Sequence, residues 1–225
     1  RYTVDEQLPE DGLYAAIVGA SIARGELIGV DASSCQDQRD FVALITAADI
    51  PGSNLQGHMV HPQAEEEILC SGRITHFGQP VALVVARTPI AAENLAARVR
   101  VIAKADDEPP ILSLDDIESN DSWFSFEDNP VDRSKEPRER QFKRGDPAAI
   151  FAAASQDPKR YAVFAGRVEV GGQSCFYLEP QCAVAYPQEA GGMRVLSSTQ
   201  SPAHVARYIA SALGVAEHQV EVEAR

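Results

Sequence analysis

Long apolar runs are missing from this sequence of 225 residues. The longest uninterrupted apolar stretch, 81–86, is far shorter than the roughly 20 residues that a helix needs to cross a bilayer. Hydrophobic residues nevertheless make up 44% of the chain, which is enough to build a core. We therefore expect neither an integral membrane protein nor a wholly disordered one.

Cysteine is also scarce, and the four thiols are those of Cys35, Cys70, Cys175 and Cys182. No two of them have the C-x-x-C spacing of zinc or iron–sulfur sites, and four are too few for a disulfide scaffold. We expect reduced, mostly buried thiols in a cytoplasmic protein. The chain lacks an initiating Met and a basic-then-apolar leader, and it ends inside an alternating stretch. Both ends are therefore expected to be cuts within a longer protein.

Basic residues are few: 20 Lys and Arg stand against 33 Asp and Glu, which gives a net charge of -13. An acidic protein repels phosphate backbones, so nucleic acid is not an expected partner. Most of the excess lies in 106–136, which holds 11 acidic and two basic residues. This segment also contains several prolines, and it is interpreted as a solvated connector rather than an acidic docking site.

The patterning on the two sides of this connector predicts two domains with strands and helices. Before it, one helix is expected from Pro89, with Thr88 as its cap, and its neighbouring strands suggest a crossover unit in a mixed sheet. After it, one helix is expected behind Asp146 and another from Pro202 to Gly214. Strands are expected at 13–18, 27–30, 41–45, 79–86, 99–103, 161–170, 193–198 and 219–223, with an extended run at 176–186.

Three groups of residues could carry chemistry but have a simpler structural interpretation. His58 and His61, followed by Glu65–Glu67, could bind zinc, yet Pro62 favours a polar loop. Cys175 and Cys182 would face opposite sides of a straight strand, which disfavours a joint metal site. The hydroxyl cluster at 197–201 could meet an anion at a helix start, but helix capping is the favoured interpretation.

The most informative stretch is Gly171-Gly172-Gln173. Two glycines within an otherwise strand-like run allow either a β-bulge or the close approach of another group to the backbone. The amide of Gln173 would then point into whatever comes close. From composition alone, a bulge with a satisfied Gln is the favoured interpretation.

Several motifs, taken in order, resemble the molybdenum-binding subunit of the xanthine dehydrogenase and molybdenum hydroxylase family. The resemblance covers nearly the whole chain, and 51–54 leans toward the xanthine dehydrogenase branch. The matching stretches are Arg1-Tyr2-Thr3-Val4-Asp5, 44–52, His76-Phe77-Gly78-Gln79-Pro80-Val81-Ala82, Gly171-Gly172-Gln173, Phe176-Tyr177-Leu178-Glu179 and Ser197-Ser198-Thr199-Gln200.

The resemblance implies an α+β fold in three parts. Residues 11–106 would form an α/β hammerhead domain of mixed sheet plus helix. Residues 107–145 would be the acidic connector, and 146–225 the first part of a second, α+β molybdopterin-binding domain.

The resemblance also implies a function. The family hydroxylates heteroaromatic or aldehyde carbon with water as oxygen source, and electrons leave through 2Fe-2S clusters, usually to FAD. Gln173 occupies the family position whose amide faces an oxygen ligand of molybdenum, with Gly171 and Gly172 allowing the backbone to come close. A neutral amide can donate to such an electron-rich group without adding charge. Phe176 and Glu179 would support this segment.

The family's partners and the departures from its pattern complete these expectations. Expected partners are the remainder of the molybdenum subunit, iron–sulfur and FAD domains or subunits, a small-molecule substrate, and a second copy in a homodimer of the complex. Ser174-Cys175 replaces the Glu-His or Asp-His that commonly follows the Gly-Gly-Gln motif, and no catalytic base of the family is present.

A purine such as xanthine is the expected substrate. The alternatives are an aldehyde oxidoreductase of the same family and a non-catalytic hammerhead module for subunit contact.

Overall fold

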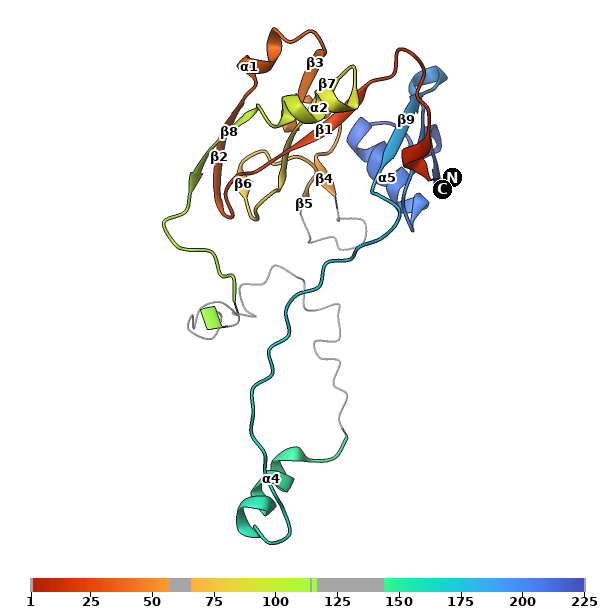
Figure 1. Ribbon diagram of the computed structural model, residues 1–225. Helices are drawn as coiled ribbons and strands as arrows, with labels where there is room; N and C mark the ends of the chain where they lie inside the picture. The colour runs from red at the N-terminus through yellow and green to blue at the C-terminus, as the bar shows by residue number, and fades with distance from the viewer. Residues whose placement is uncertain (1, 57–65, 114, 117–143, 225) are drawn as a thin grey trace. The chain divides into compact units, whose positions relative to one another are not determined.

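Three small antiparallel sheets and two helices make up the described residues between 14 and 105 in the computed structural model (Figure 1). Strand β7 lies between β1 and β3, strand β2 lies between β6 and β8, and β4 pairs with β5. The strands are β1 (Tyr14–Gly19), β2 (Gly25–Asp31), β3 (Phe41–Thr46), β4 (Leu55–Gln56), β5 (Glu66–Glu67), β6 (Arg73–Ile74), β7 (Pro80–Ala86) and β8 (Arg100–Ala105).

The structure describes residues 2–56, 66–113, 115–116 and 144–224. The chain divides into two units, one of residues 1–131 with 179–225 and one of residues 132–178. In the described ranges, no helix has both the length and the apolar character needed to span a membrane.

Helix α2 (Pro89–Ala96) begins where the sequence predicts. The Thr88 hydroxyl accepts the N–H of Ala91 at 3.1 Å, and Pro89 occupies the first turn. The predicted crossover is wrong, however, because β7 and β8, on either side of α2, belong to different sheets. The helix thus connects two sheets and packs mainly on β1 and β7.

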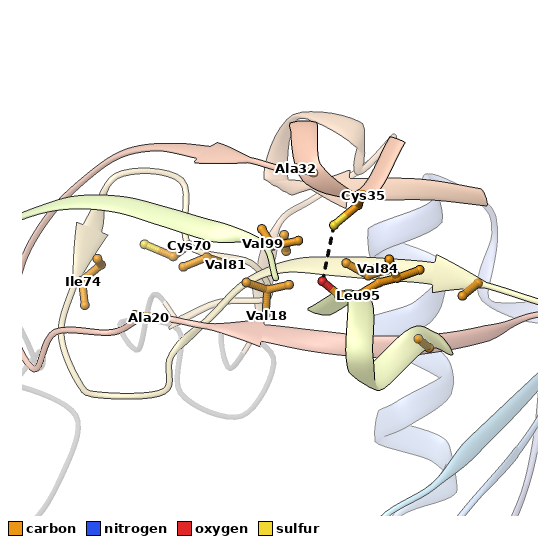
Figure 2. Packing of buried hydrophobic residues seen from close by; sticks show 13 residues of the cluster. Val18, Ala20, Ala32, Cys35, Cys70, Ile74, Val81, Val84, Leu95 and Val99 are labelled. Carbon is orange, nitrogen blue, oxygen red and sulfur yellow. Dashed lines mark hydrogen bonds between the residues drawn. The ribbon is translucent and has the colours of Figure 1, made fainter. Parts of the chain in front are cut away.

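The core lies between α2 and the two larger sheets (Figure 2). The continuous apolar run of β7 fits its central place, since none of its residues on either face is exposed. Short helix α1 (Ser33–Gln36) contributes the buried Cys35, whose thiol donates to the carbonyl oxygen of Leu95 at 3.5 Å. The core residues are Val18, Ala20, Ala32, Cys35, Cys70, Ile74, Val81, Ala82, Val84, Ala86, Ala92, Leu95 and Val99.

Asp106, directly after β8, binds two arginine side chains. Its carboxylate contacts Arg24 Nε at 2.8 Å and accepts a hydrogen bond from Arg73 Nη1 at 2.8 Å. The Arg73 guanidinium, with a smaller contribution from Arg24, holds the pKa of Asp106 below its ordinary value. The start of the acidic connector is therefore tied to the loop before β2 and to β6.

The C-terminal part forms a mixed sheet with the strands and the helix that the sequence predicts there. Strand β10 pairs antiparallel with β9 and parallel with β11, and α5 connects β10 to β11. Gly214, at a φ of 68°, ends α5 as predicted, because glycine enters the left-handed region without a steric penalty. The elements are β9 (Ala183–Pro187), β10 (Met193–Ser197), α5 (Pro202–Leu213) and β11 (Val220–Ala224), with 3-10 turns η1 (Thr3–Asp5), η2 (Ala47–Asp49), η3 (Glu189–Gly191) and η4 (Glu217–Gln219).

Glycine at position 52 connects these two parts. Its N–H donates to the carbonyl of Ala212 at 2.8 Å, and the N–H of Ser53 donates to that of Ser211 at 2.9 Å. Both carbonyls belong to the last turn of α5, where the regular helical partners run out, and that of Ser211 also accepts the N–H of Gly214 at 3.3 Å. A Cβ atom at position 52 would lie 2.1 Å from the Ser211 oxygen, so only glycine fits.

The predicted strand at 161–170 is wrong. Helix α4 (Pro147–Gln156) forms as expected, with the N–H of Ala149 donating to the Asp146 carboxylate at 3.1 Å. The residues that follow, 157–182, contain neither a helix nor a strand. No strand in the described ranges pairs with them, and a strand exists only when its backbone has a partner.

We expect Gly52→Ala to lower the free energy of unfolding by about 3 kcal/mol, because the new methyl group clashes with backbone and breaks hydrogen bonds to α5. Denaturant unfolding of the chain measures this loss. Gly72→Ala is the matched control, since nothing lies within 4 Å of its Cβ position. Equal effects of the two substitutions would contradict the proposed fit at position 52.

A second prediction concerns α2. Leu95 is 4% exposed in the core, whereas Ile90 on the same helix is 72% exposed. Leu95→Ala should cost about 3 kcal/mol through lost burial and a cavity, while Ile90→Ala should cost less than about 1 kcal/mol. The same unfolding experiment tests both, and a comparable loss for Ile90→Ala would show that this helix packs differently.

Candidate functional site

The predicted site residues lie in the segment 162–181. Apart from Arg167, which has an interaction of its own, no residue of this segment makes a backbone hydrogen bond to another described residue. Most of their side chains are exposed, including the large apolar ones. The segment thus presents both its backbone and its side chains to other groups.

Gly171, Gly172 and Gln173 lie together in the exposed middle of this segment. A Cβ atom built on either glycine would meet nothing within 4 Å, so packing within the described ranges does not require glycine there. The Gln173 amide has no hydrogen-bond partner among the described residues. The open backbone and the neutral donor fit an oxygen-rich group that approaches from outside this chain.

Glu179 lies at the end of the same stretch. Its side chain is half-buried, and its Oε1 atom is buried without a hydrogen-bond partner in the described part of the chain. A buried carboxylate oxygen is costly unless a donor reaches it. A donor from outside the described residues would satisfy this atom.

Arg167 and Glu169 are the charged side chains closest in sequence to the glycine pair. Arg167 Nε lies 2.8 Å from Glu169 Oε1, and both side chains are mostly exposed. Such an exposed pair contributes little to stability. It shows, however, that these two side chains lie on the same side of the backbone.

The hydroxyl cluster at the start of α5 is used within the fold. Ser198 Oγ accepts the N–H of Cys182 at 2.8 Å and donates to the Cys182 carbonyl at 3.1 Å, which fastens the chain entering β9. Ser201 Oγ lies 2.7 Å from Nδ1 of His204. The predicted capping role is only partly right, because Ser201 is the N-cap residue but makes no side-chain cap hydrogen bond.

The zinc candidate at His58 and His61 is not tested by the structure. His58 and His61 lie outside the described residues, and within the described ranges no group of three metal-ligating side chains occurs. Glu67 instead accepts the N–H of Ser71 at 2.9 Å. Two open hollows of about 560 and 600 Å³ are lined by residues between 27 and 81, none of them a predicted site residue of the 162–181 segment.

The four thiols are all free. Cys35 and Cys70 are buried as expected, and burial raises the pKa of the Cys70 thiol. Cys182 is half-buried, but the expectation of burial is wrong for Cys175, which is exposed. Cys175 shares the unpaired backbone segment of Gln173, which accounts for its exposure.

Comparison with protein families gives two matches that together cover most of the chain. The model for the aldehyde oxidase and xanthine dehydrogenase a/b hammerhead domain matches residues 1–105. The model for the molybdopterin cofactor-binding domain matches residues 129–225, which include Gly171, Gly172 and Gln173.

Individual relatives agree with these matches. The chain is 31% identical to a xanthine dehydrogenase of Oryza sativa over 97% of its length, and 29% identical to the xanthine dehydrogenase/oxidase of Mus musculus over 96%. It spans only 15% and 14% of the lengths of these two proteins.

Solved structures share the fold. An aldehyde oxidoreductase from Desulfovibrio gigas matches 97% of this chain and 24% of its own, with a TM-score of 0.68 and 22% identity. A quinoline 2-oxidoreductase from Pseudomonas putida 86 matches 100% of this chain and 28% of its own, with a TM-score of 0.69 and 20% identity. The hammerhead and cofactor-binding matches, in this order and over nearly the whole chain, show that it belongs to the xanthine dehydrogenase and molybdenum hydroxylase family.

Proposed function

We propose that this chain is part of a molybdenum hydroxylase that oxidises a heteroaromatic substrate, a purine such as xanthine, with water as oxygen source. The observation that carries the proposal is the 31% identity to a xanthine dehydrogenase over 97% of the chain. Within this assembly the chain supplies the hammerhead fold and part of the cofactor-binding surface. Its partners are the remainder of the molybdenum subunit and the 2Fe-2S and FAD domains or subunits, in a cytoplasmic homodimer of the complex.

Gln173 is the residue that would hold the molybdenum cofactor from this chain. When bound, the cofactor supplies the redox centre at which substrate is oxidised. The Gln173 amide would donate to an oxygen of that group, and a neutral donor is suited to this because a carboxylate would repel it. Gly171 and Gly172 leave space for the approach, in keeping with the open volume around both positions. Gln173 would act as a positioning residue, because its neutral amide donates a hydrogen bond rather than exchanging a proton.

A second candidate function is aldehyde oxidation within the same family. It is favoured by the likeness to aldehyde oxidoreductases, but at 22% and 17% identity that likeness concerns the fold alone. A third candidate is a non-catalytic hammerhead module for subunit contact. The protein purified from its native source distinguishes the three: molybdenum content with turnover of xanthine supports the proposal, turnover of aldehydes alone supports the second, and a molybdenum-free complex supports the third.

We expect Gln173→Glu to lower turnover in the assembled enzyme by about 100-fold, a loss typical of removing one preorganised donor. The added negative charge opposes the electron-rich cofactor group. Steady-state kinetics and molybdenum analysis measure the two effects separately.

Gln36→Glu is the matched control, because it makes the same change at an exposed position of α1. It should leave turnover within about 2-fold of the parent, as is usual for surface substitutions. Unchanged turnover in Gln173→Glu would remove Gln173 from the cofactor site.

A further inference from the structure

The hollow of about 600 Å³ beside β4 and β5 has a buried polar side chain in its wall. This side chain is that of Gln79, which is 7% exposed. Leu55, Ile68 and Pro80 provide the apolar part of the wall. A hollow of this volume, with apolar walls and a buried polar group, has the character of a small-molecule site. We call it the Gln79 hollow.

Hydrogen bonds from Thr75 fix the orientation of the Gln79 amide. The N–H of Thr75 donates to Gln79 Oε1 at 2.7 Å, and the Thr75 hydroxyl donates to the same oxygen at 3.2 Å. A backbone N–H can only donate, so the side-chain atom that it meets must be the amide oxygen. The other end of the Gln79 amide is therefore its amino group, a neutral donor.

The amino group of Gln79 has no hydrogen-bond partner in the described part of the chain. It is not sealed inside the protein either, because the fully buried side-chain atoms without a partner there are Thr3 Oγ1 and Glu179 Oε1. Backbone hydrogen bonds hold it in place: the N–H of Gly78 donates to Ala20 at 2.9 Å, and the N–H of Ala20 donates to Gln79 at 2.8 Å. A fixed donor that borders a hollow is suited to bind the acceptor of a ligand.

Two acceptors line the same hollow. The Thr75 hydroxyl has a single proton, which it donates to Gln79, so it must accept from Nδ1 of His76, 3.2 Å away. The neutral imidazole then carries its acceptor lone pair on Nε2. Glu66 is exposed, and its carboxylate has neither a hydrogen bond nor an ion pair with any residue that the structure describes.

The other charged side chains of the lining already have partners. Glu67 accepts the N–H of Ser71 at 2.9 Å, and Arg73 donates to Asp106 at 2.8 Å. Since the charge of Arg73 is matched by Asp106, the surplus charge at the hollow is negative. An anionic ligand would be repelled, whereas a neutral ligand would not.

We propose that the Gln79 hollow binds a small neutral molecule with an amide edge, in which a carbonyl oxygen and an N–H group lie side by side. The carbonyl oxygen would accept from the amino group of Gln79, and the N–H would donate to His76 Nε2 or to the Glu66 carboxylate. A ring attached to this edge would contact the apolar part of the wall. The hollow lies within the hammerhead match, residues 1–105, and the proposal does not rest on the proposed function.

NMR titration of the full-length protein tests the proposal, with benzamide as the probe. Benzamide has an amide edge, whereas benzoate has acceptors alone and a negative charge, so benzamide should bind at least about 10-fold more tightly. Gln79→Glu keeps an oxygen for Thr75 but removes the amino group, and should weaken benzamide binding at least about 10-fold, as loss of one hydrogen bond does. Gln36→Glu, at an exposed position of α1, is the matched control and should change it less than about 2-fold.

Lack of benzamide binding to the parent protein, or equal weakening by Gln79→Glu and Gln36→Glu, would overturn the proposal. Loss of binding in Gln173→Glu with binding kept in Gln79→Glu would place the probe at the cofactor segment and equally overturn it. A photoreactive azide derivative of benzamide locates the probe even where Gln79→Glu fails to fold. Labelling within 55–80 of the parent protein supports the proposal, and labelling confined to other peptides refutes it.

Discussion

The contact between Gly52 and the end of α5 is the constraint on which the larger unit depends. It joins a loop that follows β3 to a helix that lies some 150 residues further along the chain, through backbone atoms alone. Two terminal carbonyls of α5 receive partners, and the fit leaves no room for a side chain at position 52. Because α5 packs on β11, this contact also sets where the mixed sheet lies against the loop at 51–53.

Short-range chemistry predicted many of the elements. Thr88 with Pro89, Asp146 with Pro147, and Gly214 each mark a helix boundary that the structure reproduces, because a cap or a left-handed residue acts on its own turn. The crossover around α2 was not predictable in this way. Which sheet a strand joins depends on partners distant in sequence, and local pattern does not contain that information.

The candidate site also depends on contacts that the local sequence pattern does not contain. The residues 161–170 have the alternation of a strand, yet they form none in this chain because pairing needs a partner that is not among the described strands. Gln173 was identified from a motif and from residue chemistry, and the structure adds that its surroundings are open. The buried, unpartnered oxygen of Glu179 had no signal in the sequence, since burial arises only once the chain is folded.

The exposure of Cys175 makes it a site for selective chemical labelling. Cys35 and Cys70 are buried, Cys182 is half-buried and Cys175 is exposed. Alkylating reagents would therefore modify Cys175 ahead of Cys35 and Cys70, because reaction requires access to the sulfur. Position 175 is two residues from Gln173, so in an extended backbone the two side chains share a face. A fluorophore or spin label attached there would report on the surroundings of the Gln173 amide.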